Sequence, residues 1–244
     1  MSEERGASDQ SRALRLANML TDHIVQSGVS PGDVLPSEHK LAEQYGVSRP
    51  VVREALRLLA GRGVVEIVNG RGAVVKPLDS QPLLAYFEHA VRIQRMSFRQ
   101  IMEIRRPLEV QCARLAALRR TSDQLDAMYS VVNRMRRHIG NADAYVDLDR
   151  ELHHLIGEAS GNLLLAHMVS ALRDALNSLT HEILYRRRNR QQLERVHALH
   201  ETIVTEIGYR NADAAAHAME IHFTEALTFL IQRQEELAQR KTNV

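Results

Sequence analysis

Only one short part of this 244-residue sequence has the pattern of β-strands, and helical periodicity dominates the rest. Two β-branched runs, VVEIV at 64–68 and AVV at 73–75, flank the turn sequence NGRG, which is typical of a β-hairpin. From residue 77 to the end, apolar residues recur at helical spacing and no strand pattern appears. The chain is therefore predicted to be mainly α, with a single hairpin in its first third.

Three helical segments precede the hairpin. The first has apolar residues at helical spacing, namely Leu16, Leu20 and Ile24. The second lies between Ser37, which suits an N-cap, and Gly46, which suits a helix stop. The third begins after Ser48, tolerates Pro50 in its first turn and stops at Gly61. Two short helices across a tight turn, followed by a hairpin, predict a winged helix-turn-helix.

The third of these helices carries a basic ridge. Its arginines recur at i, i+4 and i+8, opposite the apolar side of the helix, and are Arg49, Arg53 and Arg57. Guanidinium groups at a helix N-terminus can bind a guanine edge or a phosphate, and Arg71 at the hairpin tip can reach the DNA backbone or minor groove. A solvated helix face, with Glu54 and Glu66 as salt-bridge partners, would give the same pattern.

The segment 35–75 resembles the N-terminal domain of GntR-type bacterial transcription regulators. The family pattern is LPSER-x-LA, then VSR-x-x-VREAL-x-x-L and a G-x-G-rich wing, and this sequence has LPSEHKLA, VSRPVVREALRLL and NGRG. The resemblance implies that the residues in contact with a double-stranded DNA operator are His39, Ser48, Arg49, Arg53, Gly70 and Arg71. Because His39 stands where the family usually has an arginine, a weaker contact or a different base is implied there.

Charge and cysteine content limit the class of protein. The net charge is only +2, so DNA binding depends on the local placement of arginines and not on bulk charge. The single cysteine, Cys112, excludes an intramolecular disulfide, and neither a signal peptide nor a membrane-spanning run is recognisable. A cytoplasmic protein without a membrane partner is therefore expected.

A proline-containing segment, KPLDSQP, predicts the boundary between two domains. We expect a winged helix-turn-helix DNA-binding domain at 1–77, a linker at 78–84 and an all-helical domain at 85–238. The helical domain is predicted to be an antiparallel bundle. Its helix starts are marked by residues that suit N-caps, which are Thr121, Asn141, Asn162 and Asn211.

A count of about 100° per residue separates inward from outward histidines in this domain. In the helix expected at 142–159, Asp149 and His153 flank the apolar stripe, whereas His154 faces water. The same count on the helix expected at 190–208 and on the last helix places two more histidines on apolar faces, His200 and His222. Three helices thus direct imidazole or carboxylate groups toward an otherwise aliphatic interior.

This set of side chains suits a divalent metal ion. An Asp and a His four residues apart on one helix face can chelate one ion, and the donor set favours Zn²⁺, with Ni²⁺ or Mn²⁺ as alternatives. Each histidine could instead satisfy a separate buried carbonyl or carboxylate group. The segments LDRELHHLIGEASGN, HALHETIVTEIGYRNADAAAHAMEIHF and EIRRPLEVQCARLAA resemble the FCD effector domain of the FadR subfamily of GntR regulators. The metal ligands of that domain fall on Asp149, His153, His200 and His222.

A further charged residue lies on an apolar helix face. Arg105 shares this face with aliphatic residues, and a buried cation needs an anion. The partner could be internal, since Glu109 is four residues away, or it could be the carboxylate of a small metabolite. The R-x-x-L-E motif of the FCD domain resembles RRPLE here, and this resemblance implies that Arg105 is effector-binding.

Together these features predict a homodimeric transcription regulator and not an enzyme. The winged helix would read a pseudo-palindromic operator, and a small organic acid bound at the metal site would control operator affinity. Two alternatives stay open: a regulator that senses the metal without an organic effector, and a non-haem metalloenzyme, which can use a similar ligand set.

Overall fold

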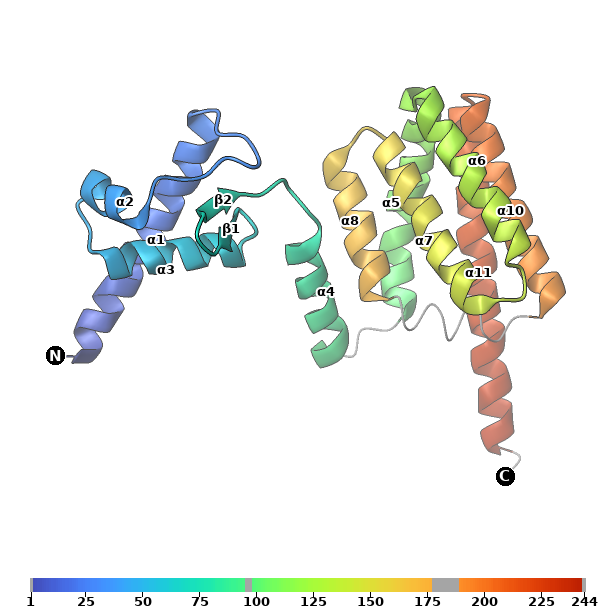
Figure 1. The fold of residues 1–244 in the computed structure, drawn as a ribbon. Helices are drawn as coiled ribbons and strands as arrows, with labels where there is room; N and C mark the ends of the chain where they lie inside the picture. Colours follow the sequence, from blue (N-terminus) through green and yellow to red (C-terminus); the bar gives the residue numbers. More distant parts are fainter. Residues whose placement is uncertain (1, 95–97, 177–188, 243–244) are drawn as a thin grey trace. The chain divides into compact units, whose positions relative to one another are not determined.

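The computed structural model describes residues 2–94, 98–176 and 189–242 (Figure 1). The chain forms two compact units, Met1–Pro82 and Leu83–Val244. In the described residues the chain is mainly α-helical, and one two-stranded antiparallel sheet lies in the first unit. The predicted fold class is therefore confirmed.

The first unit is a winged helix-turn-helix. It contains α1 (Ser2–Gln26), α2 (Glu38–Tyr45), α3 (Arg49–Gly61), β1 (Val65–Val68) and β2 (Gly72–Val75). The Ser37 hydroxyl accepts a hydrogen bond from the Lys40 amide at 3.4 Å, which caps α2. Gly46 ends this helix in the left-handed conformation, with φ of 63°. Ser48 precedes α3 as predicted, although its side chain makes no capping hydrogen bond.

One apolar core holds the first unit together. It joins the inner faces of α1 and α3 to both strands, and its members include Leu16, Leu20, Ile24, Val52, Ala55, Leu59, Val65 and Val75. The strands pair in the register Val65 to Val75, and Val34 forms an additional bridge to Val74. Because α3 buries its apolar side in this core, its arginines are left on the solvent-exposed side.

The rest of the described chain is a helical bundle. It contains α4 (Gln81–Gln94), α5 (Phe98–Arg119), α6 (Ser122–Arg137), α7 (Ala142–Ala159), α8 (Leu163–Ala175), α10 (Arg190–Gly208) and α11 (Ala212–Thr242). Helix α5 packs against four others, α7, α8, α10 and α11, and is therefore central to the bundle (Figure 1). Among the described helices, none has the combination of length and apolarity that crossing a bilayer requires.

The ends of these helices agree closely with the sequence patterns. Thr121 forms a capping box with Gln124. At the starts of α7, α8 and α11, the side chain of an asparagine accepts a hydrogen bond from a backbone amide; these asparagines are Asn141, Asn162 and Asn211. One element differs from expectation. Helix α4 begins at Gln81, inside the range expected for the linker. Pro82 is compatible with this start, because a proline in the first helical turn loses no intrahelical hydrogen bond.

Candidate metal centre and DNA-binding face

The four predicted metal ligands come together inside the bundle. Asp149 and His153 lie on α7, His200 lies on α10 and His222 lies on α11. Each residue offers one ligand atom, and these four atoms lie within 4.8 Å of one another. The three imidazole ring centroids are 4.5 to 5.6 Å apart. The inward faces predicted for three separate helices thus meet at one point inside the bundle.

The ligand atoms are buried and lack hydrogen bonds of normal geometry. This holds for Asp149 Oδ1, His153 Nε2, His200 Nε2 and His222 Nδ1. Two of the imidazoles face the same carboxylate oxygen, Asp149 Oδ1. This oxygen lies 3.6 Å from His153 Nε2 and 3.0 Å from His200 Nε2. Buried polar atoms left in this state are costly unless something binds them. Three imidazole nitrogens and one carboxylate oxygen fit a first-row divalent ion such as Zn²⁺.

Burial also keeps two of the imidazoles, those of His153 and His222, in the form that binds metal. The pKa of His153 is lowered by burial and by the charge of Arg173. The pKa of His222 is lowered well below its ordinary value by burial and by its histidine neighbours. Both rings are therefore neutral at neutral pH, as a metal ligand must be.

Arg105 lies beside this cluster, paired with an internal carboxylate. Its side chain is 4% exposed, and its Nε and Nη2 donate to Glu109 Oε1 at 2.9 and 2.7 Å. The internal partner considered from the sequence is therefore present. The guanidinium carbon also lies 5.5 Å from the centre of the Phe223 ring.

A second buried arginine completes the network. Arg173 on α8 donates to Asp149 and lies 3.3 Å from Glu109 Oε2. Burial alone would raise the pKa of Glu109, but the charges of Arg105 and Arg173, together with the hydrogen-bonding contact to His153, hold it well below its ordinary value. Asp149 behaves in the same way, with Arg173 as the largest opposing charge. Both carboxylates are therefore ionised, and Arg173 joins the arginine network to a predicted metal ligand.

Sequence reasoning placed the outward residues correctly but missed two inward ones. His154 is exposed, with Ser170 and Glu158 as its neighbours. Arg173 and Tyr145 were not recognised, although both are buried. A signal existed in each case. Arg173 continues the helical stripe of Ala166 and Val169, and Tyr145 lies one turn before Asp149.

The predicted DNA-contacting arginines lie exposed at the start of α3. The side chains of Arg49 and Arg53 are 62% and 55% exposed. Both face Glu38 on α2, which accepts from Arg53 Nε and Nη2 at 3.2 and 3.0 Å and lies 3.9 Å from Arg49 Nη2. The hydrogen bond from Arg53 lowers the pKa of Glu38. Glu38 was not predicted from the sequence as the partner of these arginines. Of the two carboxylates that were predicted, Glu54 and Glu66, Glu54 pairs with Arg57.

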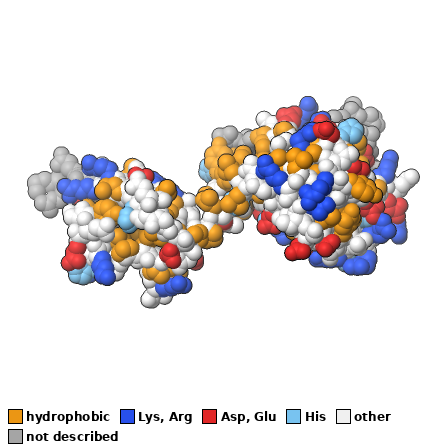
Figure 2. All heavy atoms as spheres, turned by 90° about the horizontal axis from the view of Figure 1, so that it is seen from above, with side chains coloured by type: hydrophobic (Ala, Val, Ile, Leu, Met, Phe, Trp, Pro, Cys, Tyr) orange, Lys and Arg blue, Asp and Glu red, His pale blue; other side chains and the backbone are white. Residues whose placement is uncertain are grey.

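The other predicted DNA contacts are also accessible. His39 is exposed on α2 and lies 3.6 Å from Glu43, and Ser48 is exposed beside Arg49. Gly70 and Arg71 form the exposed tip of the wing, where Gly70 has φ of 77°. Over the face of the helical unit visible in Figure 2, basic and acidic side chains are interspersed. The predicted DNA-binding face is therefore defined by the local placement of arginines on α3 and the wing and not by overall charge.

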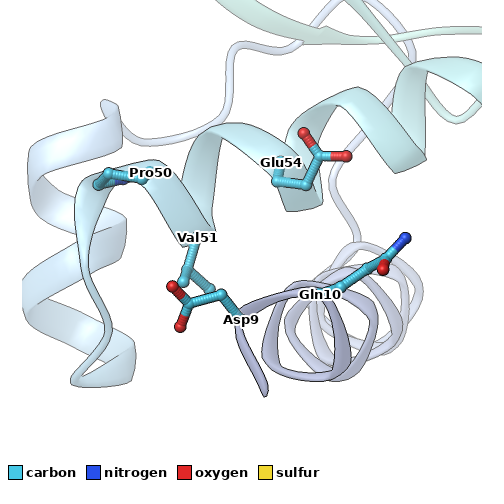
Figure 3. Close-up of a pocket in the computed structure, with 5 residues that line it drawn as sticks. All are labelled: Asp9, Gln10, Pro50, Val51 and Glu54. Carbon is cyan, nitrogen blue, oxygen red and sulfur yellow. The ribbon is translucent and has the colours of Figure 1, made fainter. Parts of the chain in front are cut away.

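A surface pocket of about 360 Å³ lies between α1 and α3 (Figure 3). Its lining residues are Asp9, Gln10, Pro50, Val51 and Glu54. Of these only Val51 is buried, and both charged groups are acidic. The pocket is therefore unsuited to phosphate, and it is separate from the arginines that face Glu38.

Comparisons with known proteins find matches for both parts of the chain. The family model described as bacterial regulatory proteins, gntR family, matches residues 12–75, and the FCD domain model matches residues 100–225. LutR, an HTH-type transcriptional regulator of Bacillus subtilis (strain 168), is 30% identical over 223 residues, which cover 88% of this chain and 100% of LutR. The Glc operon transcriptional activator of Escherichia coli (strain K12) is 30% identical over 188 residues, 72% of each chain.

A solved structure shares the fold. Streptococcus agalactiae GntR superimposes with a TM-score of 0.67 at 24% identity, covering 87% of this chain and 97% of that one. The two family models together span both units, and LutR aligns over its whole length. The chain therefore belongs to the GntR family of bacterial DNA-binding transcription regulators and carries an FCD domain.

Proposed function

We propose that a small organic acid and a divalent metal ion, both bound in the helical domain, control the operator affinity of this regulator. The observation that carries the proposal is the buried cluster of Asp149 and three histidines beside two buried arginines. The metal would be Zn²⁺, with Ni²⁺ or Mn²⁺ as alternatives. When bound, it would supply a Lewis-acidic position for a carboxylate oxygen.

The residues of the chain would hold the acid from the other side. Arg105 and Arg173 are buried positive charges beside the cluster, and a guanidinium group can bind a carboxylate through two parallel hydrogen bonds. Both arginines already share Glu109, so the acid would compete with this carboxylate for Arg105. During that exchange Glu109 would keep Arg173 as its counter-charge.

On the DNA side, we propose direct contacts from α3 and the wing. Arg49 and Arg53 would enter the major groove, with His39 and Ser48 beside them, while Gly70 and Arg71 would approach the backbone or minor groove. A homodimer in the cytoplasm would place two such domains on a pseudo-palindromic operator. The proposed domains are 1–77 and 85–238, joined at 78–84.

A second candidate has the metal alone as the signal. It is favoured by the internal pairing of Arg105 with Glu109, which already provides the buried cation with its anion. Enzymatic activity is not proposed, because the relatives that align with this chain are transcription regulators.

Metal analysis and an operator-binding titration separate these candidates. The purified protein is analysed for bound metal and for a co-purified acid by mass spectrometry. Operator binding is then measured with a panel of organic acids, with and without chelator. An effect of an acid that chelation abolishes supports the first candidate, whereas an effect of metal without any acid supports the second. A protein that retains no metal and responds to neither contradicts both.

A further inference from the structure

Two of the proposed metal ligands have their second ring nitrogen in contact with a buried polar group. His153 turns Nε2 toward Asp149 and contacts Glu109 Oε2 through Nδ1. His200 turns Nε2 toward the same Asp149 oxygen, and its Nδ1 lies 3.3 Å from the Tyr145 hydroxyl. Glu109 and Tyr145 are 1% and 0% exposed, so water does not compete for these contacts.

The two partners differ in hydrogen-bonding capacity. Glu109 is ion-paired with Arg105 and Arg173, and an ionised carboxylate can only accept hydrogen bonds. His153 must then carry its proton on Nδ1, which leaves the Nε2 lone pair directed at the cluster. At 3.6 Å, Nε2 is also too far from Asp149 Oδ1 for a hydrogen bond, in agreement with this tautomer.

Tyr145 can serve His200 in either tautomer, because a hydroxyl group both donates and accepts. Without metal, a proton on His200 Nε2 would face the Asp149 carboxylate, whose Oδ1 lies 3.0 Å away, while the Tyr145 hydroxyl donates to Nδ1. With metal on Nε2, the proton must be on Nδ1 and the same hydroxyl accepts it. The two states therefore differ in the position of the ring proton.

We propose that Glu109 and Tyr145 are the positioning residues of this metal centre. Glu109 keeps His153 ready for metal in both states, and Tyr145 allows His200 to change tautomer when metal binds. This inference rests on the proposed function only in requiring that the cluster binds a metal. Groups that orient metal-bound histidines typically change metal affinity about 10- to 100-fold when removed.

Two conservative variants test the roles separately. Glu109→Asp keeps the negative charge required by Arg105 and Arg173 but shortens the reach to His153. Tyr145→Phe removes only the hydroxyl group. We expect each to weaken Zn²⁺ binding about 10- to 100-fold, measured by competition with a chromophoric chelator. Two matched controls, Glu151→Asp on the surface of α7 and Tyr129→Phe on α6, should bind Zn²⁺ like the wild type.

Long-range ¹H–¹⁵N NMR correlations of the histidine rings report the tautomer of each ring. A change of tautomer at one ring is not a result that a general loss of stability would produce. In the metal-free wild type we expect the Nδ1–H tautomer at His153 and the Nε2–H tautomer at His200, and Zn²⁺ should convert only His200. Glu109→Asp should disturb the tautomer of His153 alone, and Tyr145→Phe should affect His200 alone. If Glu109→Asp does not fold, Glu109→Gln, which keeps the side-chain length, takes its place.

The outcomes separate this inference from the proposed function. A wild type that does not bind Zn²⁺, Ni²⁺ or Mn²⁺ removes the metal proposal, and the inference with it. A wild type that binds metal tightly, with both variants unchanged in affinity and in ring tautomers, overturns the positioning roles alone. So does an Nε2–H tautomer at His153 in the metal-free wild type.

Discussion

Adjacent histidines of this chain have opposite environments. The side chain of His153 is 0% exposed and contacts Glu109, whereas that of His154 is 52% exposed. Neighbouring residues of a helix differ by about 100° in direction, so only one of the two can face the cluster. Chemical identity alone therefore says little about a histidine here, and its position on the helix decides what it can bind.

The first prediction compares His200→Ala with His154→Ala. Loss of His200 removes a proposed ligand, so bound metal and the stabilisation that metal confers should both fall. At metal concentrations of 100 to 1,000 times Kd, this stabilisation is about 3–4 kcal/mol. His154→Ala should change neither quantity. Metal content and thermal unfolding, with and without chelator, measure both, and equal behaviour of the two variants would contradict the inward and outward assignment.

The buried ionisable residues also predict acid sensitivity of the metal-free protein. His153 and His222 have lowered pKa values in the fold, so below pH about 6.5 the unfolded chain binds protons that the folded chain does not. Stability should therefore fall as the pH decreases through this range, by up to about 1.4 kcal/mol per pH unit for each histidine. Glu109 and Asp149, whose pKa values are also lowered, add a loss below pH about 4.5.

Urea unfolding of chelator-treated protein between pH 8 and pH 5 measures this dependence. His222→Leu should reduce the slope between pH 6.5 and pH 5, because one of the two histidines no longer titrates. His217→Leu, an exposed position on the same helix, is the matched control. A slope that His222→Leu leaves unchanged would mean that this ring is not held neutral by the fold.

At the scale of elements, α3 owes its role to two different faces. The apolar side of α3 packs in the core of the first unit, so Arg49 and Arg53 extend into solvent from the opposite side of the helix. Glu38 on α2 holds Arg53 through two hydrogen bonds, which restricts its guanidinium group before DNA arrives. The proposed DNA-binding face thus involves α2 as well as α3.

Arg49→Ala should weaken specific operator binding by about 1–3 kcal/mol and leave stability and metal binding unchanged. The reason is that this side chain is 62% exposed, and that its ion pair among the described residues is a 3.9 Å contact to Glu38. Operator binding at fixed salt, compared with binding to unrelated DNA, measures the effect. Arg92→Ala on α4 is a control with the same charge change, and an unaltered operator affinity for Arg49→Ala would exclude this residue from the interface.

Helices and their caps were predictable because their signals are local. Thr121 with Gln124, and Asn141, mark helix starts within four residues of sequence. The convergence of Asp149, His200 and His222 was predictable only as three separate inward faces. The contacts of Glu109 with His153, and of Arg173 with Asp149, depend on how helices pack across the bundle. Periodicity within one helix indicates that Arg173 and Tyr145 face inward, but it contains no information on the partners that they meet across the bundle.

At the scale of the whole molecule, regulation requires that the acid distinguish two states of the protein. A ligand can shift an equilibrium only by the difference between its affinities for the two states. The proposed site is suited to this, because its residues come from α5, α7, α8, α10 and α11. A carboxylate bound there would touch several helices at once, so a change in their packing would alter its affinity.

Arg105→Met tests whether this site controls DNA binding. Methionine keeps most of the buried volume, and Glu109 retains Arg173 as its counter-charge, so the fold and the metal content should persist. Operator binding without acid should also be nearly unchanged. The acid, however, should lose about 2–3 kcal/mol of affinity, because a charge-assisted pair of hydrogen bonds in a buried site is removed.

The neighbouring arginine supplies the control for this prediction. Arg106 pairs with Glu220 at the edge of the bundle, and its side chain is 38% exposed, so Arg106→Met removes the same charge without reaching the cluster. Titration of the acid into an operator-binding assay should shift the dose response for Arg105→Met and not for Arg106→Met. An identical response of both variants and the wild type would mean that Arg105 serves only Glu109, and that the acid acts elsewhere. Because metal content is measured in the same samples, a loss of metal would not be mistaken for a loss of acid binding.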